Sequence, residues 1–419
     1  MRVDELLKHK CFENLNYRIA EKKDMPIKVI GVGNGGGNAV TNLYYENIEG
    51  TTLVICDTND RKLQASPVEK QILLKTPHES GIDFEKYSQK ERDVIQNYYY
   101  LSRGMPGYGA GNEPIIAQLA AENTLPEINN LLENTQMVFL TASMGGGSGT
   151  GATAVIAEAC HKKNILTVGI VTLPFGWEGK KKMREAWAGV EKMKPFVDAL
   201  LIILNDNLTN EKILEKYKDK LSFSNYNELY ADELFKLADN VLADAVKSVV
   251  EMIEKTGYID LDFADVYTAL KGGGGTIMDS GYATGENRFY KAMENALGSP
   301  LLYNFDISNA TRVVMAFYSS REHRFSQPEF NQIQAFSQRF ADEYWFKLGM
   351  YYDDTLGEQA KVTILATSAE GKDILPSELE TLLNFTKDKD ATNKSPLKIF
   401  DDKDILADYQ NKIAYNRVL

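Results

Sequence analysis

The nonapeptide MGGGSGTGA occupies residues 144–152, one residue after the apolar run MVFLTA at 137–142. Five of its nine residues are glycine, and the helical pattern ATAVIAEACHKK begins where it ends. Glycines at the junction of a strand and a helix let the backbone approach a ligand closely, because no side chain intervenes. Taken alone, this stretch is compatible with a dinucleotide site, a nucleoside triphosphate site or a turn without a ligand.

A second glycine loop, GVGNGG at residues 31–36, follows a strand predicted at 26–33 and precedes a helix predicted at 38–48. It satisfies the pattern G-x-G-x-x-G, and Asp57 in the next predicted strand, 51–59, is the matching ribose acid. By itself, this βαβ unit predicts a dinucleotide site and hence an NAD-dependent oxidoreductase.

A third glycine loop, GYGAG at residues 107–111, changes this interpretation. Three loops of backbone N–H donors at one sheet edge suit a triphosphate better than a single pyrophosphate. The sequence has no G-x-x-x-x-G-K-[ST] pattern, so it is not a P-loop NTPase. We therefore expect the phosphates to be bound mainly by backbone amides and a metal ion.

Strands and helices alternate along the chain, which predicts a parallel, doubly wound α/β sheet. Further strands are predicted at 137–144, 165–175 and 199–204. A long helix with apolar spacing near 3.6 residues follows at 229–256, and Gly257 is its expected end.

A second unit follows this helix, with strands predicted at 311–320 and 360–369. Between them, SQPE at 326–329 has the form of a capping box, ahead of a helix expected to run to Trp345. After about residue 370 the chain becomes rich in lysine and aspartate, which is typical of a flexible linker.

The composition is that of a soluble globular protein of 419 residues, with 43% hydrophobic and 25% charged residues. A net charge of −12 argues against nucleic acid as the default partner. No apolar run is long enough for direct membrane insertion, and the charged start lacks a signal-peptide core. Three cysteines and four scattered histidines predict neither disulfides nor a transition-metal site. We therefore expect a cytoplasmic protein.

Five stretches together resemble the tubulin/FtsZ family, and their order and spacing match it from about residue 27 to 370. They are GVGNGGGNAV (31–40), GYGAGNEP (107–114), MGGGSGTGA (144–152), PFGWEGKKKM (174–183) and GYIDLDFADV (257–266). The resemblance implies an α/β fold with a Rossmann-like, doubly wound GTPase domain, a long central helix and a second α+β domain. The boundaries expected from the sequence are an N-terminal extension at 1–26, a GTP-binding domain at 27–228, the central helix at 229–256, the second domain at 257–370, a linker at 371–403 and a C-terminal peptide at 404–419.

By resemblance, the protein binds GTP or GDP, with Mg²⁺ as the expected metal ion, and the three glycine loops hold the phosphates. The residues implied in these contacts are Gly33, Asn34, Gly35, Gly36, Gly37 and Asn38 in the first loop, Gly109, Ala110 and Gly111 near the γ-phosphate, and Gly145, Gly146, Gly147, Ser148, Gly149, Thr150 and Gly151 in the signature loop.

Four further residues are implied in binding the nucleoside. Glu178 would bond the ribose, and Lys182 stands where the family has arginine, which exchanges a rigid fork of donors for a flexible point charge. Asn205 and Asn240 would accept hydrogen bonds from guanine, although Asn240 also fits a polar position on a helix face. Adenine would leave such acceptors unpaired, so we expect GTP rather than ATP.

Asp262 and Asp265 are three residues apart and share a face if a helix begins here. Such a pair can polarise a water or hold a cation, and it can equally cap a helix; Asp265 is the harder of the two to explain as a cap. The resemblance implies that they are catalytic, acting on the γ-phosphate of the subunit below in a head-to-tail homopolymer. Hydrolysis would then depend on polymerisation.

The chain departs from the family pattern at several positions. Ser148 replaces threonine, Asp260 replaces asparagine, Asn59 replaces aspartate, and residues 76–104 are longer than usual. These changes leave open a hydrolysis-poor, tubulin-like paralogue with a cytoskeletal or DNA-partitioning role.

The family resemblance also implies a role and partners. The filament would organise the bacterial division ring at mid-cell. The final residues KIAYNRVL loosely resemble a peptide that binds membrane-anchor or division proteins, and a frayed end explains them equally well.

Overall fold

The computed structural model describes residues 26–218, 230–297, 307–340 and 343–367. The expected linker and C-terminal peptide, and all of the N-terminal extension except Pro26, lie outside these described residues.

Within the described residues, the strands form one sheet in the order β3-β2-β1-β4-β5-β6-β7-β10-β8-β9. Strands β1 to β6 pair in parallel, β10 pairs antiparallel with β7 and β8, and β9 pairs in parallel with β8. The bounds are β1 (Ile27–Val32), β2 (Thr52–Asp57), β3 (Lys70–Leu73), β4 (Met137–Ser143), β5 (Leu166–Leu173), β6 (Ala199–Leu204), β7 (Gly274–Ala283), β8 (Arg312–Ser319), β9 (Trp345–Tyr352) and β10 (Ala360–Thr367). The expected parallel α/β domain with a second α+β unit is confirmed.

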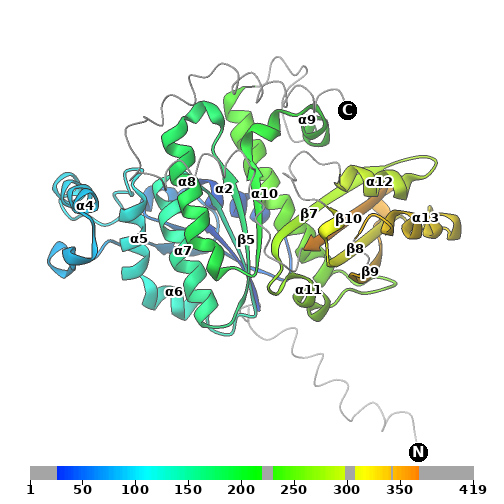
Figure 1. Ribbon diagram of the computed structural model, residues 1–419, viewed down its shortest axis with the longest axis horizontal. Helices are drawn as coiled ribbons and strands as arrows, with labels where there is room; N and C mark the ends of the chain where they lie inside the picture. Colours follow the sequence, from blue (N-terminus) through cyan, green and yellow to red (C-terminus); the bar gives the residue numbers. More distant parts are fainter. Residues whose placement is uncertain (1–25, 219–229, 298–306, 341–342, 368–419) are drawn as a thin grey trace, which may run out of the picture.

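Helices cover both faces of this sheet (Figure 1). The α-helices are α2 (Gly33–Tyr45), α3 (Asp60–Gln64), α4 (Gln89–Ser102), α5 (Pro114–Asn123), α6 (Leu125–Leu131), α7 (Gly147–Lys162), α8 (Lys180–Met193), α9 (Glu211–Tyr217), α10 (Ala231–Glu254), α11 (Phe263–Leu270), α12 (Arg288–Leu297) and α13 (Gln327–Ser337). The 3-10 turns are η2 (Glu79–Gly81), η3 (Phe84–Lys86), η4 (Gly176–Glu178), η5 (Lys194–Phe196), η6 (Asn205–Thr209), η9 (Ile307–Asn309) and η10 (Asp354–Leu356).

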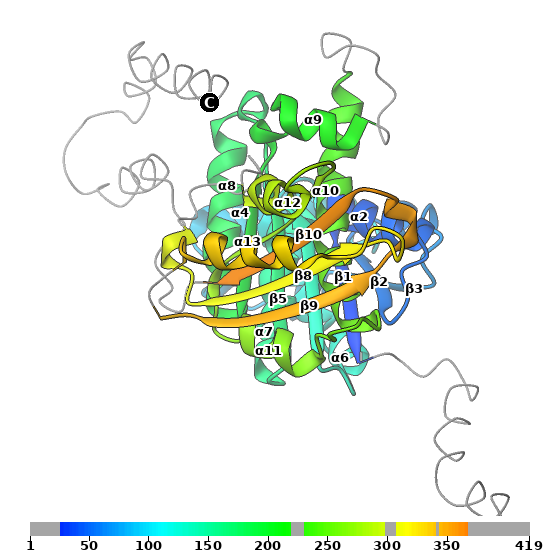
Figure 2. The same ribbon diagram turned by 90° about the vertical axis from the view of Figure 1, so that its right-hand side faces the viewer.

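The core is divided by the sheet. Side chains of α2 and α10 pack on one face of β1 to β6, and those of α5, α7 and α8 pack on the other. A third cluster lies between α12, α13 and strands β8 and β10, and Figure 2 shows both helices lying across that part of the sheet. The α10 cluster also includes Met278, Val314 and Leu365, so this helix joins the two units of the fold.

Helix α10 ends at Glu254, close to the stop expected from Gly257. The reason for glycine at 257 is a close approach, because a Cβ there would lie 2.2 Å from the carbonyl oxygen of Met350. This contact draws the segment after α10 onto strand β9.

Several expected bounds were wrong. The helices expected at 38–48 and from Ala152 begin earlier, at Gly33 and Gly147, because the glycine loops themselves form the first helical turns. The helix expected to continue to Trp345 ends at Ser337, and Trp345 begins β9. Over short apolar and aromatic runs, a helix and a half-buried strand have similar patterns, which is why β9 was missed.

Candidate functional site

The three glycine loops meet at the carboxyl ends of β1 and β4. Gly33 has a φ of +71°, and a Cβ on it would lie 2.8 Å from the backbone nitrogen of Gly149. A Cβ on Gly147 would lie 2.8 Å from the Cβ of Ala110 in the third loop. Side chains at these positions would push the loops apart, so the glycines allow three backbone segments to converge.

Two long helices begin at this point without a capping side chain. Neither α2, of 13 residues, nor α7, of 16 residues, has a side-chain hydrogen bond at its N-cap or an acidic residue in its first turn. Their first N–H groups are therefore available, and each helix N-terminus favours an anion by about 0.3–1 kcal/mol. The residues predicted to contact phosphates lie in the first turns of α2, in the turn and first turns of α7, and in the loop before α5.

A hydroxyl network fixes the signature loop. Ser148 Oγ lies 2.8 Å from Thr58 Oγ1 and donates to Asp57 Oδ1 at 3.0 Å. The backbone N–H of Asn59 donates to the same Asp57 oxygen at 3.0 Å. Asp57 is buried, and burial raises the pKa of its carboxyl. Because Asp57 holds loops together, it is not the free ribose acid that the dinucleotide interpretation required.

The end of β2 also positions the third glycine loop. The Gly109 N–H donates to the carbonyl of Thr58 at 3.0 Å, and Asn59 pairs with Tyr108 in an isolated β-bridge. Asn59 Oδ1 accepts from the N–H of Arg61 at 3.1 Å and so caps α3. Asn59, which stands where the family has aspartate, therefore still caps this helix.

Glu178 and Lys182 form the rim beside the signature loop. Glu178 Oε1 accepts from the Phe175 N–H at 2.9 Å, and its other oxygen forms an ion pair with Lys182 Nζ. A Cβ on Gly145 would lie 2.9 Å from Lys182 Cγ, which puts this lysine directly against the loop.

The three amide and carboxylate groups near the predicted base position have different environments. Asn205 is buried, and its Oδ1 has no hydrogen-bond partner among the described residues. Asn240 Oδ1 is occupied, because it accepts from Asn42 Nδ2 at 2.9 Å. Its neighbour Asp239 instead accepts from Asn38 Nδ2 at 2.9 Å, beside the first glycine loop. The acceptor expected from the sequence is Asn240, whereas the side chain that contacts the first glycine loop is Asp239.

Burial raises the pKa of Asp239 to about 7, because the charged form loses hydration, while the Asn38 hydrogen bond lowers it. A carboxylate that titrates near neutrality at a cluster of backbone donors is typical of a binding site. One residue along a helix corresponds to a rotation of about 100°, which explains why adjacent acceptors have such different partners.

An aromatic cluster, also missed by the sequence analysis, lies beside these groups. The ring centroids of Phe175 and Trp177 are 5.4 Å apart, and Phe235 lies 5.4 Å from Phe175 and 5.8 Å from Trp177. Trp177 is 64% exposed and Phe235 is 41% exposed. Phe235 and Asp239 are four residues apart on α10 and share one face, and that spacing could have identified both.

The two predicted catalytic acids cap α11. Asp262 Oδ1 accepts from the Asp265 N–H at 2.9 Å, and Asp265 Oδ2 accepts from the Asp262 N–H at 3.2 Å. The expectation that Asp265 is difficult to explain as a cap was therefore wrong, because it is the second member of a capping box. Asp265 also forms an ion pair with Lys347 Nζ at 3.0 Å. Asp260 Oδ1 accepts from the Gly257 N–H at 2.6 Å and closes the turn after α10.

The glycine loops and the acids lie at opposite ends of α10. Asp239, in the third turn of this helix, contacts the first glycine loop, whereas Asp260, Asp262 and Asp265 follow its C-terminus. Between Asp239 and its last residue, Glu254, the helix rises by roughly 22 Å. One molecule therefore does not bring its own acids to its own glycine loops.

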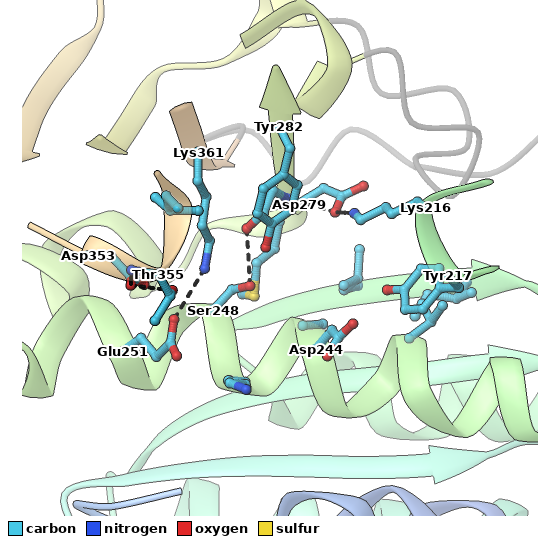
Figure 3. A pocket seen from close by; sticks show the side chains of 18 residues that line it. Lys216, Tyr217, Asp244, Ser248, Glu251, Asp279, Tyr282, Asp353, Thr355 and Lys361 are labelled. Carbon is cyan, nitrogen blue, oxygen red and sulfur yellow. Dashed lines mark hydrogen bonds and ion pairs between the residues drawn. The ribbon is translucent and has the colours of Figure 1, made fainter. Parts of the chain in front are cut away.

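A separate cavity of about 370 Å³ lies between α10, β7 and η10 (Figure 3). Its lining includes two ion pairs, Lys361–Glu251 at 3.2 Å and Lys216–Asp279 at 2.5 Å, and no residue of the glycine loops. Among the residues that the structure describes, no cluster of three His, Cys, Asp or Glu side chains could hold a metal ion, and no helix could span a membrane.

Comparisons with known proteins identify the class. Residues 26–212 match the GTPase domain of the Tubulin/FtsZ family, and residues 274–370 match the C-terminal domain of the FtsZ family. The fold and the glycine loops are therefore those of a tubulin-like GTPase, a GTP- and GDP-binding protein. Within this class, the chain belongs to the FtsZ family of cell division proteins.

The similarity to individual relatives extends over most of the chain. The cell division protein FtsZ of Porphyromonas gingivalis is 39% identical over 81% of this chain and 66% of its own length. The FtsZ of Coxiella burnetii is 36% identical over 81% of this chain and 78% of its own length.

Solved structures agree with these matches. An empty FtsZ dimer from M. jannaschii superimposes with a TM-score of 0.68 at 30% identity, over 87% of this chain and 95% of the other. CetZ2 of Haloferax volcanii, a GTPγS-bound protofilament, gives 0.63 at 16% identity over 87% of this chain and 99% of its own, which shows a shared fold.

Proposed function

We propose that this protein hydrolyses GTP at a site shared by two copies. The site would combine the glycine loops of one copy with the acidic loop of the next, which is the segment 257–265 that carries Asp260, Asp262 and Asp265. As a member of the FtsZ family, it is a GTPase that forms filaments in the division ring. The observation that carries the proposal is the separation of the two half-sites by the part of α10 between Asp239 and Glu254.

Binding of the phosphates is supported by the uncapped starts of α2 and α7. Their N–H groups, with those of Ala110 and Gly111, would surround the triphosphate, whereas the Gly109 N–H is already bonded to the Thr58 carbonyl. Mg²⁺ would be held mainly by phosphate oxygens and water, because Mg²⁺ keeps several waters and the described residues offer no carboxylate cluster at these loops. When bound, it would neutralise phosphate charge.

Selection of guanine is supported by two acceptors. The unpaired Oδ1 of Asn205 and the carboxylate of Asp239 can both receive hydrogen bonds from the N–H groups of guanine. Asp239 replaces Asn240 in this assignment, because the Asn240 amide oxygen is already bonded to Asn42. Phe235 and Trp177 would provide an aromatic wall beside the base, and Glu178 and Lys182 would face the ribose and the signature loop.

The hydrolytic step would use the acidic loop of the next copy. Asp265 or Asp262 would accept a proton from a water as its oxygen attacks the γ-phosphorus, and the bond to the β-phosphate oxygen would break, giving GDP and phosphate. Head-to-tail stacking is the arrangement that brings opposite ends of two copies together. We also infer location at mid-cell from the family; a partner bound through residues 404–419 remains a prediction outside the described residues.

Sedimentation and phosphate release test this proposal. Wild-type protein should pellet with GTP and not with GDP, and its specific GTPase activity should rise with protein concentration because the site needs two copies. ATP should support neither. Specific activity that stays constant with dilution would contradict the shared site. Pelleting with GTP but without phosphate release would also contradict it and would favour a hydrolysis-poor paralogue.

Asp265→Asn is the sharpest variant of this test. Asparagine can retain the capping hydrogen bond while losing the base, so GTP binding and pelleting should persist and turnover should fall by roughly 10²-fold or more. Loss of GTP binding in this variant would instead assign Asp265 a purely structural role. Asp232→Asn, at an exposed position in the first turn of α10, is a matched control that should keep full activity.

A further inference from the structure

Strand β9 holds the acidic loop through one of its two faces. Alternate residues of a strand point to the same side, and Lys347, Gly349 and Tyr351 form such a set. A Cβ on Gly349 would lie 2.8 Å from Leu261 Cδ1, so the absence of a side chain there makes room for Leu261. This set of three residues therefore forms a cradle for the loop, and Lys347 is its charged member.

The other contacts of the cradle fix the loop backbone. The Leu261 N–H donates to the Tyr351 hydroxyl at 3.1 Å, and that hydroxyl donates to the Met252 carbonyl at 2.8 Å. The Tyr258 N–H donates to the Met350 carbonyl at 2.7 Å, and the Met350 N–H donates to Ile259 at 2.9 Å. The backbone is thus held independently of Lys347, and the lysine adds a contact to one carboxylate.

That contact orients Asp265. Lys347 Nζ lies 3.0 Å from Asp265 Oδ2, and the Asp262 N–H bonds the same oxygen at 3.2 Å. Both contacts are made to Oδ2 of Asp265, and neither is made to its Oδ1. Two donors on one oxygen fix the plane of the carboxylate and leave the other oxygen for a water. The Asp265 side chain is 15% exposed, so both donors act on a largely desolvated group.

The charge of Lys347 also matters at this position. Asp260, Asp262 and Asp265 bring three carboxylates into six residues, and the proposed partner of this loop is a triphosphate. Carboxylates and phosphates carry charges of the same sign and repel each other when they approach. A cation on Asp265 offsets part of that repulsion when two copies meet.

We propose that Lys347 is a positioning residue for GTP hydrolysis, acting through Asp265 on the nucleotide of the neighbouring copy. This inference rests on the proposed shared site. Lys347 would affect the rate of GTP turnover and not the affinity for the nucleotide, because the glycine loops lie at the other end of the molecule.

Three variants test the role of Lys347. Lys347→Met should lower kcat about tenfold, because misplacement of a general base removes part of its contribution. Lys347→Arg should recover most of the activity. Lys271→Met is the matched control: Lys271 is also 40% exposed and pairs with Asp198 at 2.9 Å, on the far end of α11, and its loss should leave kcat unchanged.

The readouts separate positioning from a general effect. GTP affinity of the unassembled protein and pelleting with a non-hydrolysable GTP analogue should match wild type in Lys347→Met. In an Asp265→Asn background, Lys347→Met should cause no further loss, because the two residues act as a unit. Full activity of Lys347→Met, equal losses in Lys271→Met, no recovery by arginine, or weakened GTP affinity would each overturn the inference. If wild type itself lacks concentration-dependent turnover, the shared site fails, whatever the effect of Lys347.

Discussion

At the scale of single residues, Asp239 is the side chain whose chemistry depends most on its surroundings. Burial raises its pKa to about 7 from 3.8, so the nucleotide-free protein holds a largely protonated carboxyl at mildly acidic pH. Donors on guanine favour the charged form. We therefore expect GTP binding to release a proton near neutral pH and to tighten as the pH rises through 7.

Asp239→Asn should change how stability depends on pH. The folded-state pKa is above the unfolded value, so the stabilising effect of the neutral carboxyl is complete below about pH 4 and is lost as the pH rises to about 7. The variant cannot ionise, and it should exceed wild type in unfolding free energy by about 1–3 kcal/mol at pH 8. Urea unfolding at pH 5 and pH 8 measures this, and a pH-independent difference would contradict it.

The sequence signal for the site is strongest where backbone chemistry decides. The glycine loops at 31–38 and 144–152 were identified because close backbone approach requires glycine. The base acceptor was assigned to Asn240 although Asp239 faces the first glycine loop, since neighbouring residues on a helix point in different directions and their phase depends on packing. The cap formed by Asp262 and Asp265 was considered from the sequence, whereas their partner Lys347 is distant in the chain and had no local signal.

At the scale of elements, β9 links the end of α10 to the acidic loop. Burial raises the pKa of Tyr351 to about 12, so its hydroxyl keeps the proton that it donates to Met252. This strand was not predicted, and its first residue, Trp345, was assigned to the end of a helix. Strand β7 was also missed, because the glycines at its start indicate a loop. Helix α10 and strand β4 were predicted well, because α10 has apolar residues at helical spacing over many turns and β4 is a continuous apolar run.

Tyr351→Phe should loosen the acidic loop. The change leaves the buried Leu261 N–H and Met252 carbonyl without their shared partner, at a cost of about 1–3 kcal/mol. Hydrogen exchange at residues 257–262 should accelerate while exchange in α7 stays unchanged. Tyr352→Phe is the control, since Tyr352 is exposed and its ring contact with Arg321 does not need the hydroxyl. Equal exchange in both variants would argue against a clamp.

At the scale of the whole molecule, the two units share one sheet through a narrow connection. Strand β6 pairs with β7 over two residue pairs, Ala199–Gly274 and Leu200–Gly275, whereas β4 and β5 pair over seven. The Lys271–Asp198 ion pair, helix α10 and the ion pairs across the cavity beside that helix also connect the units. Lys361 is central there: it pairs with Glu251, and its Nζ lies 4.8 Å from the ring centroid of Tyr318.

Lys361→Met should weaken the association of the two units. Both partners of the pair are less than one-fifth exposed, so removing the cation leaves a partly buried carboxylate, at a cost of about 1–3 kcal/mol. Denaturant unfolding should show a lower midpoint and a broader transition if the units begin to unfold separately. Lys236→Met removes an exposed pair on α10 and should leave the midpoint unchanged. A wild-type midpoint for Lys361→Met would contradict this role.

The length of α10 has a consequence for any filament of this protein. From its contact with the first glycine loop at Asp239 to its end at Glu254, the helix spans roughly 22 Å, so it sets a minimum axial repeat at which the acids of one copy reach the loops of the next. Lengthening it by one turn would add about 5.4 Å. Copies with different helix lengths would then stack with unequal spacing along a shared filament. The axial repeat measured in filament images should therefore depend on the length of α10.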